Sequence, residues 1–251
     1  MKKSVMFLIG FLIILLIVSC PVSAYFVGSD GNADNGNNGN KPTILVEYGK
    51  GKDIGLVKVT HIHYAKSEAK GKPPQTDTCY KLAGWKWSVP VTYTVNPDAI
   101  TPDKPSLIAA ISSADSEWGS HTFAKLFNAP VEGTNLWNVR DYKNSVSYGN
   151  YPTSNVIAVT VTWYNQRTKT AVESDILFDT DFTWGNVDQT PSVMDLQNIA
   201  THEIGHTLGL SDLYSGSCSP VTMYGYSSEG DVAKRTLESP DITGLQKLYG
   251  L

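Results

Sequence analysis

From residue 89 onward, the apolar and polar positions predict strands and helices in mixed order. Residues 89–95 alternate like a half-buried strand, and residues 156–163 and 174–178 are two further strand segments rich in apolar side chains. Residues 105–127 predict a helix, because their apolar side chains recur at helical spacing. These side chains are Leu107, Ile108, Ile111, Ala114 and Trp118. Residues 128–154 are polar and rich in Gly, Asn and Tyr, so we expect irregular structure there.

Two shorter strands are predicted ahead of this region. Residues 43–48 and 55–64 have the composition of strands, and the turn-rich residues 49–53 join them. The segments 28–40 and 66–78 on either side are polar and are interpreted as linkers. Whether these strands inhibit the main domain, fold with it or only tether it stays open.

The first 24 residues have the pattern of a secretory signal peptide. Lys2 and Lys3 precede an apolar run from Val5 to Val18, and a small-x-small sequence ends at Ala24. Two alternatives stay open, namely an uncleaved membrane anchor and a lipoprotein in which Cys20 carries the lipid. In every version the rest of the chain lies outside the cytoplasm. We therefore divide the chain into a signal peptide (1–24), an N-terminal extension (25–78) and a catalytic domain (79–251).

The charge balance limits the classes of partner. Twenty basic and 24 acidic residues give a net charge of −4 over 251 residues. This balance gives no electrostatic reason to expect binding to nucleic acid or to an anionic membrane surface. We expect a monomer, with no membrane partner beyond an N-terminal anchor.

The chemistry of the chain is concentrated in residues 202–212, with the sequence HEIGHTLGLSD. Residues four apart share one face of a helix, so His202 and His206 can offer two imidazoles to one metal ion. Gly209 can turn the chain back at the end of the helix, and Asp212 can then reach the same ion. Three nitrogen and oxygen ligands with one open position are typical of catalytic zinc. Glu203 can reach a water at that position without displacing it.

A bare H-E-x-x-H can also arise by chance on a helix surface. Residues 194–200 and the leucines at 208 and 210 make this helix apolar, however, and unsatisfied imidazoles and carboxylates would be costly in such surroundings. The motif together with Gly209 and Asp212 therefore predicts a hydrolase with one catalytic zinc.

This stretch resembles the metzincin metalloproteases, whose signature is H-E-x-x-H-x-x-G-x-x-H or D followed by a turn that contains methionine. Residues 219–226, SPVTMYGY, match the turn, and residues 237–250 resemble the closing helix of the matrixin branch. The resemblance covers about the last 170 residues. It implies an α+β fold with a mixed, mainly antiparallel twisted sheet, Glu203 as general base and Met223 as an apolar floor beneath the metal. It also implies that residues 155–163 form the edge strand above the cleft, where an extended peptide substrate would pair.

The chain departs from the matrixin pattern at three positions. Asp212 stands where matrixins usually have a third histidine, and carboxylate is an acceptable zinc ligand. Leu177 stands where the family has a histidine for a structural zinc, so we expect no second zinc. Asp179 matches a family calcium ligand, but Phe182 replaces its glutamate partner. Asp179 and Asp181 are therefore interpreted as a solvated turn, with Ca²⁺ as the alternative.

Three other histidines could in principle bind the metal. His61 and His63 would face the same side of a strand, and His121 would lie on the next helix. We interpret them as ordinary structural or surface residues, because Asp212 supplies the third ligand without any long-range coincidence.

Only Cys79 and Cys218 remain after removal of a signal peptide, and in an oxidising compartment they predict one disulfide. The alternative is a cysteine switch, in which Cys79 binds zinc in a latent form. Cys79 lacks the Pro-Arg-Cys-Gly surroundings of the matrixin switch, so the disulfide is preferred.

The sequence thus predicts a secreted zinc endopeptidase that acts on proteins or peptides. The competing hypotheses are a surface binding or adhesion module on the same scaffold, and a processing protease limited to one partner. The presence of Glu203 argues against the binding module, because a protein that has lost catalysis has no reason to keep its general base. The identity of the substrate is not contained in the sequence.

Overall fold

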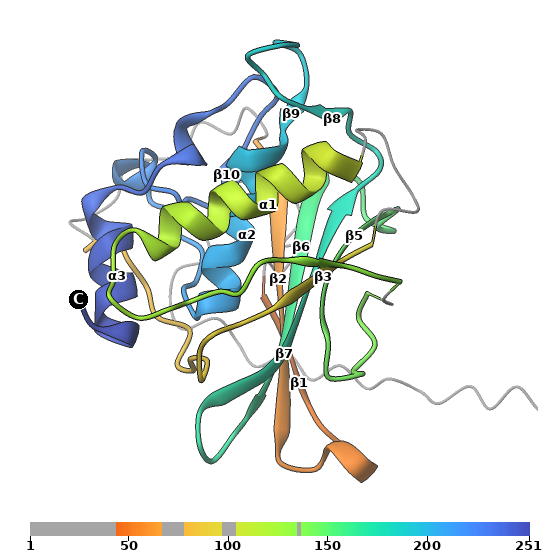
Figure 1. The fold of residues 1–251 in the computed structure, drawn as a ribbon, viewed down its shortest axis with the longest axis vertical. Coiled ribbons are helices and arrows are strands. Elements are labelled where there is room, and N and C mark those ends of the chain that lie inside the picture. The colour runs from red at the N-terminus through yellow and green to blue at the C-terminus, as the bar shows by residue number, and fades with distance from the viewer. Residues whose placement is uncertain (1–43, 67–77, 97–103, 135–136) are drawn as a thin grey trace, which may run out of the picture.

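The computed structural model describes residues 44–66, 78–96, 104–134 and 137–251. The expected signal peptide, Cys20 and most of the two expected linkers lie outside these residues. The described chain forms one large mixed sheet with its three α-helices gathered on one side (Figure 1). This arrangement matches the α+β fold that the sequence predicts.

The strands occur in the order β1-β2-β6-β7-β5-β3-β4 across the sheet, and β10 adds to β2 beside this path. Their bounds are Ile44–Tyr48 (β1), Leu56–Ala65 (β2), Tyr93–Val95 (β3), Val131–Glu132 (β4), Asn144–Gly149 (β5), Val156–Asn165 (β6), Thr170–Asp179 (β7) and Tyr226–Ser227 (β10). The long pairings β1–β2, β2–β6 and β6–β7 are antiparallel, and the short pairings of β3, β4, β5 and β10 are parallel. Strands β8 (Trp184–Gly185) and β9 (Met194–Asp195) form a separate small sheet.

Three α-helices follow the same chain order as predicted. They are α1 (Lys104–Gly119), α2 (Leu196–Leu208) and α3 (Ser239–Tyr249), and the 3-10 turns η1 (Gly51–Asp53), η2 (Gly216–Cys218) and η3 (Ala233–Arg235) lie in loops. The main core fills the space between the helices and the sheet, and it contains buried side chains of α1, α2, β5 and β7. A smaller cluster of Ile62, Val159, Val161 and Trp163 covers the opposite face of β2 and β6. Helix α2 is therefore the central helix, buried along almost its whole length.

Three local predictions are wrong. The helix expected over residues 105–127 ends at Gly119, because the backbone of Leu126 and Asn128 pairs with Val91 instead. The strand expected over residues 89–95 is regular only from Tyr93. Strand β5 lies inside the stretch that was expected to be irregular. Its polar sequence hides a central strand, because Ser145 and Ser147 are buried and only two of its six residues are large and apolar.

The two N-terminal strands form where the sequence predicts them, but they change the role of β6. Strand β2 pairs with β6 from Leu56↔Asn165 to Tyr64↔Val156, so β6 has neighbours on both sides. The expectation that residues 155–163 form a free edge is therefore wrong. The residues that take the edge are more than ninety positions earlier in the chain, too far for a local pattern to reveal.

Candidate metal centre and its surroundings

Helix α2 begins and ends at residues suited to those positions. Asp195 caps its N-terminus by accepting a hydrogen bond from the amide of Asn198. At the other end Gly209 adopts a left-handed conformation with φ of 100°, and a Cβ there would lie 2.3 Å from the carbonyl oxygen of Trp85. Only glycine fits this position, both for conformation and for space. The turn sends the chain back, so that Asp212 lies beside the helix that carries the two histidines.

The ligand atoms of His202, His206 and Asp212 lie within 4.8 Å of one another, and all three residues are buried. The Nδ1 atom of His202 donates to the Thr222 carbonyl at 2.7 Å, and that of His206 donates to the Leu210 carbonyl at 3.0 Å. In the neutral imidazoles each Nε2 atom therefore presents a lone pair, and both face Asp212 Oδ1, at 3.1 and 3.3 Å.

This donor set fits a cation. Among the described residues, the two Nε2 atoms and both Asp212 oxygens have no hydrogen-bond partner, although all four are buried. Two lone pairs and a carboxylate repel one another in such a place unless a positive charge lies between them. Two imidazole nitrogens and one carboxylate are ligands that Zn²⁺ accepts, and backbone bonds to the remote ring nitrogens orient zinc-binding histidines.

A proton is the alternative to a metal ion at this position. Burial disfavours the charged imidazolium of His206, but the neighbouring Asp212 carboxylate outweighs burial and raises the pKa of His206 to about 9. Burial together with the nearby His63 lowers the pKa of His202 to about 3. Metal binding must therefore displace a proton from the His206–Asp212 pair.

Both carboxylate oxygens of Glu203 are engaged by neighbouring strands. Thr160 of β6 donates its hydroxyl hydrogen to Oε2 at 2.6 Å, and His63 Nδ1 of β2 lies 3.0 Å from Oε1. Burial raises the pKa of Glu203, while the imidazoles of His202 and His206 act in the opposite direction. The carboxyl group thus lies beside the candidate metal ligands and in a place where a proton can be taken up.

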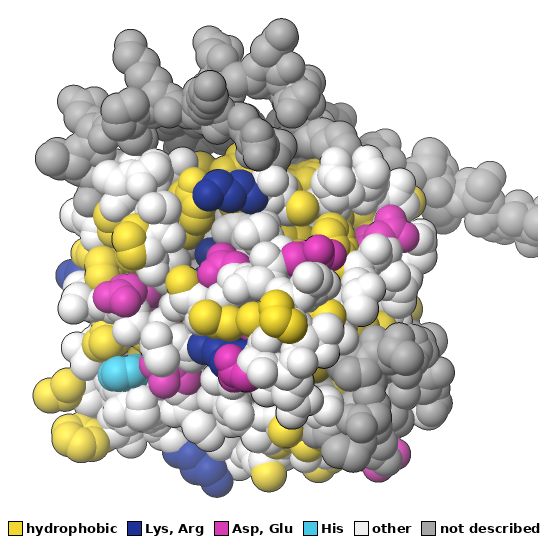
Figure 2. Space-filling view, turned by 90° about the horizontal axis from the view of Figure 1, so that it is seen from above, with side chains coloured by type: hydrophobic (Ala, Val, Ile, Leu, Met, Phe, Trp, Pro, Cys, Tyr) yellow, Lys and Arg dark blue, Asp and Glu magenta, His cyan; other side chains and the backbone are white. Residues whose placement is uncertain are grey.

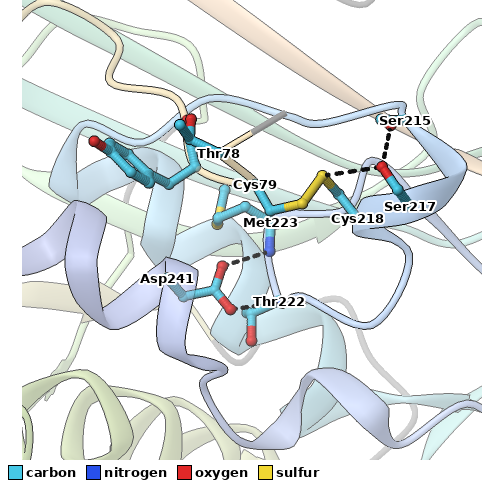
Figure 3. The surroundings of a disulfide bond; sticks show 9 residues. Thr78, Cys79, Ser215, Ser217, Cys218, Thr222, Met223 and Asp241 are labelled. Carbon is cyan, nitrogen blue, oxygen red and sulfur yellow. Dashed lines mark hydrogen bonds between the residues drawn. A yellow bond between two sulfur atoms is a disulfide. The ribbon is translucent and has the colours of Figure 1, made fainter. Parts of the chain in front are cut away.

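Met223 packs against helix α2 at Gly205. Gly205 lies between the two histidine ligands in the sequence, and a Cβ on it would come within 2.3 Å of Met223 Sδ and 2.8 Å of Trp118 Cζ2. The turn that carries Met223 is held by the buried Asp241 of α3, whose carboxylate accepts the amides of Thr222 and Met223 (Figure 3). Met223 therefore has a packing role under the site.

The structure joins Cys79 to Cys218, and this disulfide lies beside the same turn (Figure 3). Cys79 is consequently not available as a metal ligand, which agrees with the preference for a disulfide over a cysteine switch. The bond ties the start of the expected catalytic domain to the loop that precedes Met223.

A family model for matrixins matches residues 84–250 of this chain, which is most of its length. The chain belongs to the matrixin family.

Relatives of this matrixin include Metalloendoproteinase 1 of Glycine max, which is 40% identical over 80 residues, and Matrilysin of Homo sapiens, which is 36% identical over 81 residues. The Hatching enzyme of Paracentrotus lividus is 38% identical over 76 residues. These matches cover 30%, 32% and 30% of this chain but only 25%, 28% and 12% of the relatives. Members of the family are zinc metalloendopeptidases.

His61 and His63, which the sequence pattern favours as ordinary structural or surface residues, lie at the candidate site of this matrixin. His61 stacks on His206 with ring centroids 4.2 Å apart, and the ring centroids of His63 and His202 are 4.0 Å apart. His63, His202 and Glu203 form a second group whose ligand atoms lie within 4.8 Å. The only sequence signal was the spacing of the pair by two residues, which shows that they share a face but not what that face covers.

The remaining metal predictions concern residues away from this centre. Among the described residues, the two groups that contain His202 are the only ones arranged for a metal, and Asp179, Asp181 and His121 belong to neither. The Asp179 oxygens accept the amides of Asp181 and Tyr151, and Asp181 accepts the side chain of Asn150. Leu177 is buried in β7.

Two further observations concern surface charge and membrane-spanning helices. On the face shown in Figure 2, acidic and basic side chains are interspersed, without a large area of one sign. In the part of the chain that the structure describes, no helix is both long and apolar enough to cross a membrane.

Proposed function

We propose that this matrixin is a secreted zinc endopeptidase in which His202, His206 and Asp212 hold one zinc ion and Glu203 is the general base. The observation that carries the proposal is the set of bare, buried ligand atoms beside a carboxyl group that is not needed as a ligand. Export is supported by the Cys79–Cys218 disulfide, because such bonds persist in oxidising compartments.

Each group has a defined role in peptide hydrolysis. A zinc ion held there would acidify a water molecule and polarise the carbonyl of the peptide bond. Glu203 takes the proton from the attacking water and passes it to the leaving amine. Thr160 orients the Glu203 carboxylate through its short hydrogen bond, and Met223 and Gly205 keep the helix that carries both histidines in place.

The proposal is tested by comparing Glu203→Gln with Asp212→Ala. Zinc is counted by mass spectrometry, and casein hydrolysis is measured with and without chelator. Both the intact chain and a chain cut within residues 67–77 are assayed, because the cut separates strands β1 and β2 from the rest. We expect about one zinc per wild-type chain. Glu203→Gln should keep this zinc and lose hydrolysis by about a hundredfold to ten-thousandfold, because only the proton transfer is removed.

Asp212→Ala should lose zinc instead, and added zinc should restore part of its activity but none of that of Glu203→Gln. A wild-type chain that binds zinc yet never hydrolyses peptides in a chelator-sensitive way would contradict the proposal. Full zinc binding and activity in Asp212→Ala would show that the third ligand is another residue.

A further inference from the structure

Strand β2 covers the edge of β6 beside the candidate site along its whole length, and β1 pairs on its outer side. Its ten residues pair antiparallel with β6, and at its C-terminal end Tyr64 and Ala65 pair in parallel with Tyr226 and Ser227 of β10. The amide of Lys66 continues this contact by donating to the Ser227 carbonyl at 2.8 Å. An extended segment thus lies between β6 and the chain that follows the Met223 turn. Extended peptides bind sheet edges through this kind of backbone pairing.

The side chains of β2 that face α2 lie directly on the metal-ligand candidates. Alternate residues of a strand point to opposite faces, so His61 and His63 point to one side and Ile62 packs in the cluster on the other. The His61 ring stacks on the His206 ring with 8° between the planes, and the His63 ring covers His202 at a tilt of 36°. Strand β2 therefore brings two imidazoles against the two histidines of the motif.

Strand β2 also binds the general base. His63 Nδ1 contacts Glu203 Oε1 at 3.0 Å, while Thr160 holds Oε2, so a water molecule at Oε1 would have to compete with His63. The exposed fraction is 0% for His202, Glu203 and His206 and 4% for Asp212. A peptide bond cannot reach these groups while β2 lies there, because the reacting atoms must come into contact with them.

We propose that residues 44–66 are a built-in occupant of the substrate-binding edge, which keeps the enzyme inactive until the strand is displaced, with His63 holding Glu203. This inference rests on the proposed peptidase function. The displaced strand leaves β6 with a free edge, and an extended peptide then lies along it as β2 does. Strand β1 and the ion pair of Asp53 with Arg140 fasten the far end of the same hairpin.

The first experiment uses the full chain with a recognition site for a specific protease placed within residues 67–77. Hydrolysis of a fluorogenic peptide is measured before cutting and after cutting and dilution. We expect kcat/KM to rise by about a hundredfold or more, because the cut turns an intramolecular occupant with an effective concentration in the millimolar range into a separate peptide. Hydrogen exchange of the β6 amides should rise in parallel. A chain without the inserted site, treated with the same protease, is the control.

The second experiment does not depend on hydrolysis. A synthetic peptide with the sequence of residues 56–65, LVKVTHIHYA, should bind the cut and diluted protein, as measured by fluorescence anisotropy. The same peptide with alanine at both histidine positions should bind at least about tenfold more weakly, since it loses the ring contacts and the contact with Glu203.

Point variants of the uncut chain test the role of His63. His63→Ala should raise the basal rate several-fold, because it frees Glu203 and loosens β2. Lys58→Ala is the matched control on the same strand, because Lys58 is half-buried, pairs with Glu47 and lies on the Ile62 face of β2, opposite the two histidines. It should leave the basal rate unchanged. Circular dichroism checks that both variants fold.

The outcomes separate this proposal from the proposed function. Equal rates before and after cutting, without binding of the 56–65 peptide, would overturn the role of β2 and leave the peptidase intact. Zinc and peptide binding without hydrolysis in the cut protein would support the role of β2 as occupant and contradict the peptidase. Loss of fold after dilution of the hairpin would show that residues 44–66 are a structural part of the domain, and it would also overturn the proposal.

Discussion

Helix α2 with its following turn, residues 196–226, and the β1–β2 hairpin, residues 44–66, contribute to the same site in different ways. In the helix region, the candidate ligands and the proposed general base all lie within residues 202–212. The hairpin reaches the same atoms from far away, since His63 and Glu203 are 140 positions apart. The comparison shows that the candidate metal ligands are encoded locally, whereas the strand that covers them is placed by a long-range pairing.

The largest expected effect on stability concerns the Cys79–Cys218 disulfide, which links the helix region to the preceding chain. Replacement of both cysteines by serine, Cys79→Ser with Cys218→Ser, should lower the free energy of unfolding by about 4 kcal/mol, because the bond closes a loop of 139 positions. Urea denaturation measures this change. The hairpin contains neither cysteine, so exchange of its amides through local opening should stay unchanged. A variant as stable as the wild type would show that the helix region does not depend on this covalent bond.

A second prediction asks whether the hairpin opens independently of the rest. Ile62→Ala should cost about 2–4 kcal/mol, because Ile62 is buried against Val159 and its neighbours. If the hairpin opens as a unit, this loss appears in the exchange of β1 and β2 amides and hardly in global unfolding. Val159→Ala on β6 is the matched control and should lower global stability. Equal global destabilisation by both variants would erase the distinction between the two regions.

The smallest effect concerns the packing beneath α2. Gly205→Ala should destabilise the protein by about 1–3 kcal/mol, since the new methyl group would collide with Met223 and Trp118. Its affinity for zinc should fall as well, because the helix that carries both histidines must shift. Gly216→Ala is the control, since a Cβ at Gly216 has open space around it. Thermal unfolding and zinc titration measure both effects. A Gly205→Ala variant with unchanged stability would show that the floor under the site is loosely packed.

Much of the fold follows from local patterns. The helix α2, the strands β1, β2, β6 and β7 and the turn at Gly209 lie close to where spacing and turn chemistry predict them. Strand β5 and the end of α1 do not, because each depends on a partner distant in the sequence. Buried serines make β5 look like a loop, and the pairing of Leu126 with Val91 removes residues from the expected helix.

The sequence by itself determined the donor atoms of the site, because a helix places residues four apart on one face and one glycine suffices to bring Asp212 back to them. Only the tertiary structure decided which strand lies over those atoms. The alternation of β2 shows that His61 and His63 share a face. It does not show which strand β2 pairs with, because strands pair through backbone hydrogen bonds that leave no signal in the side-chain pattern. Eleven consecutive residues are thus enough to predict the candidate site, whereas the strand that covers it is known only from the register between β2 and β6.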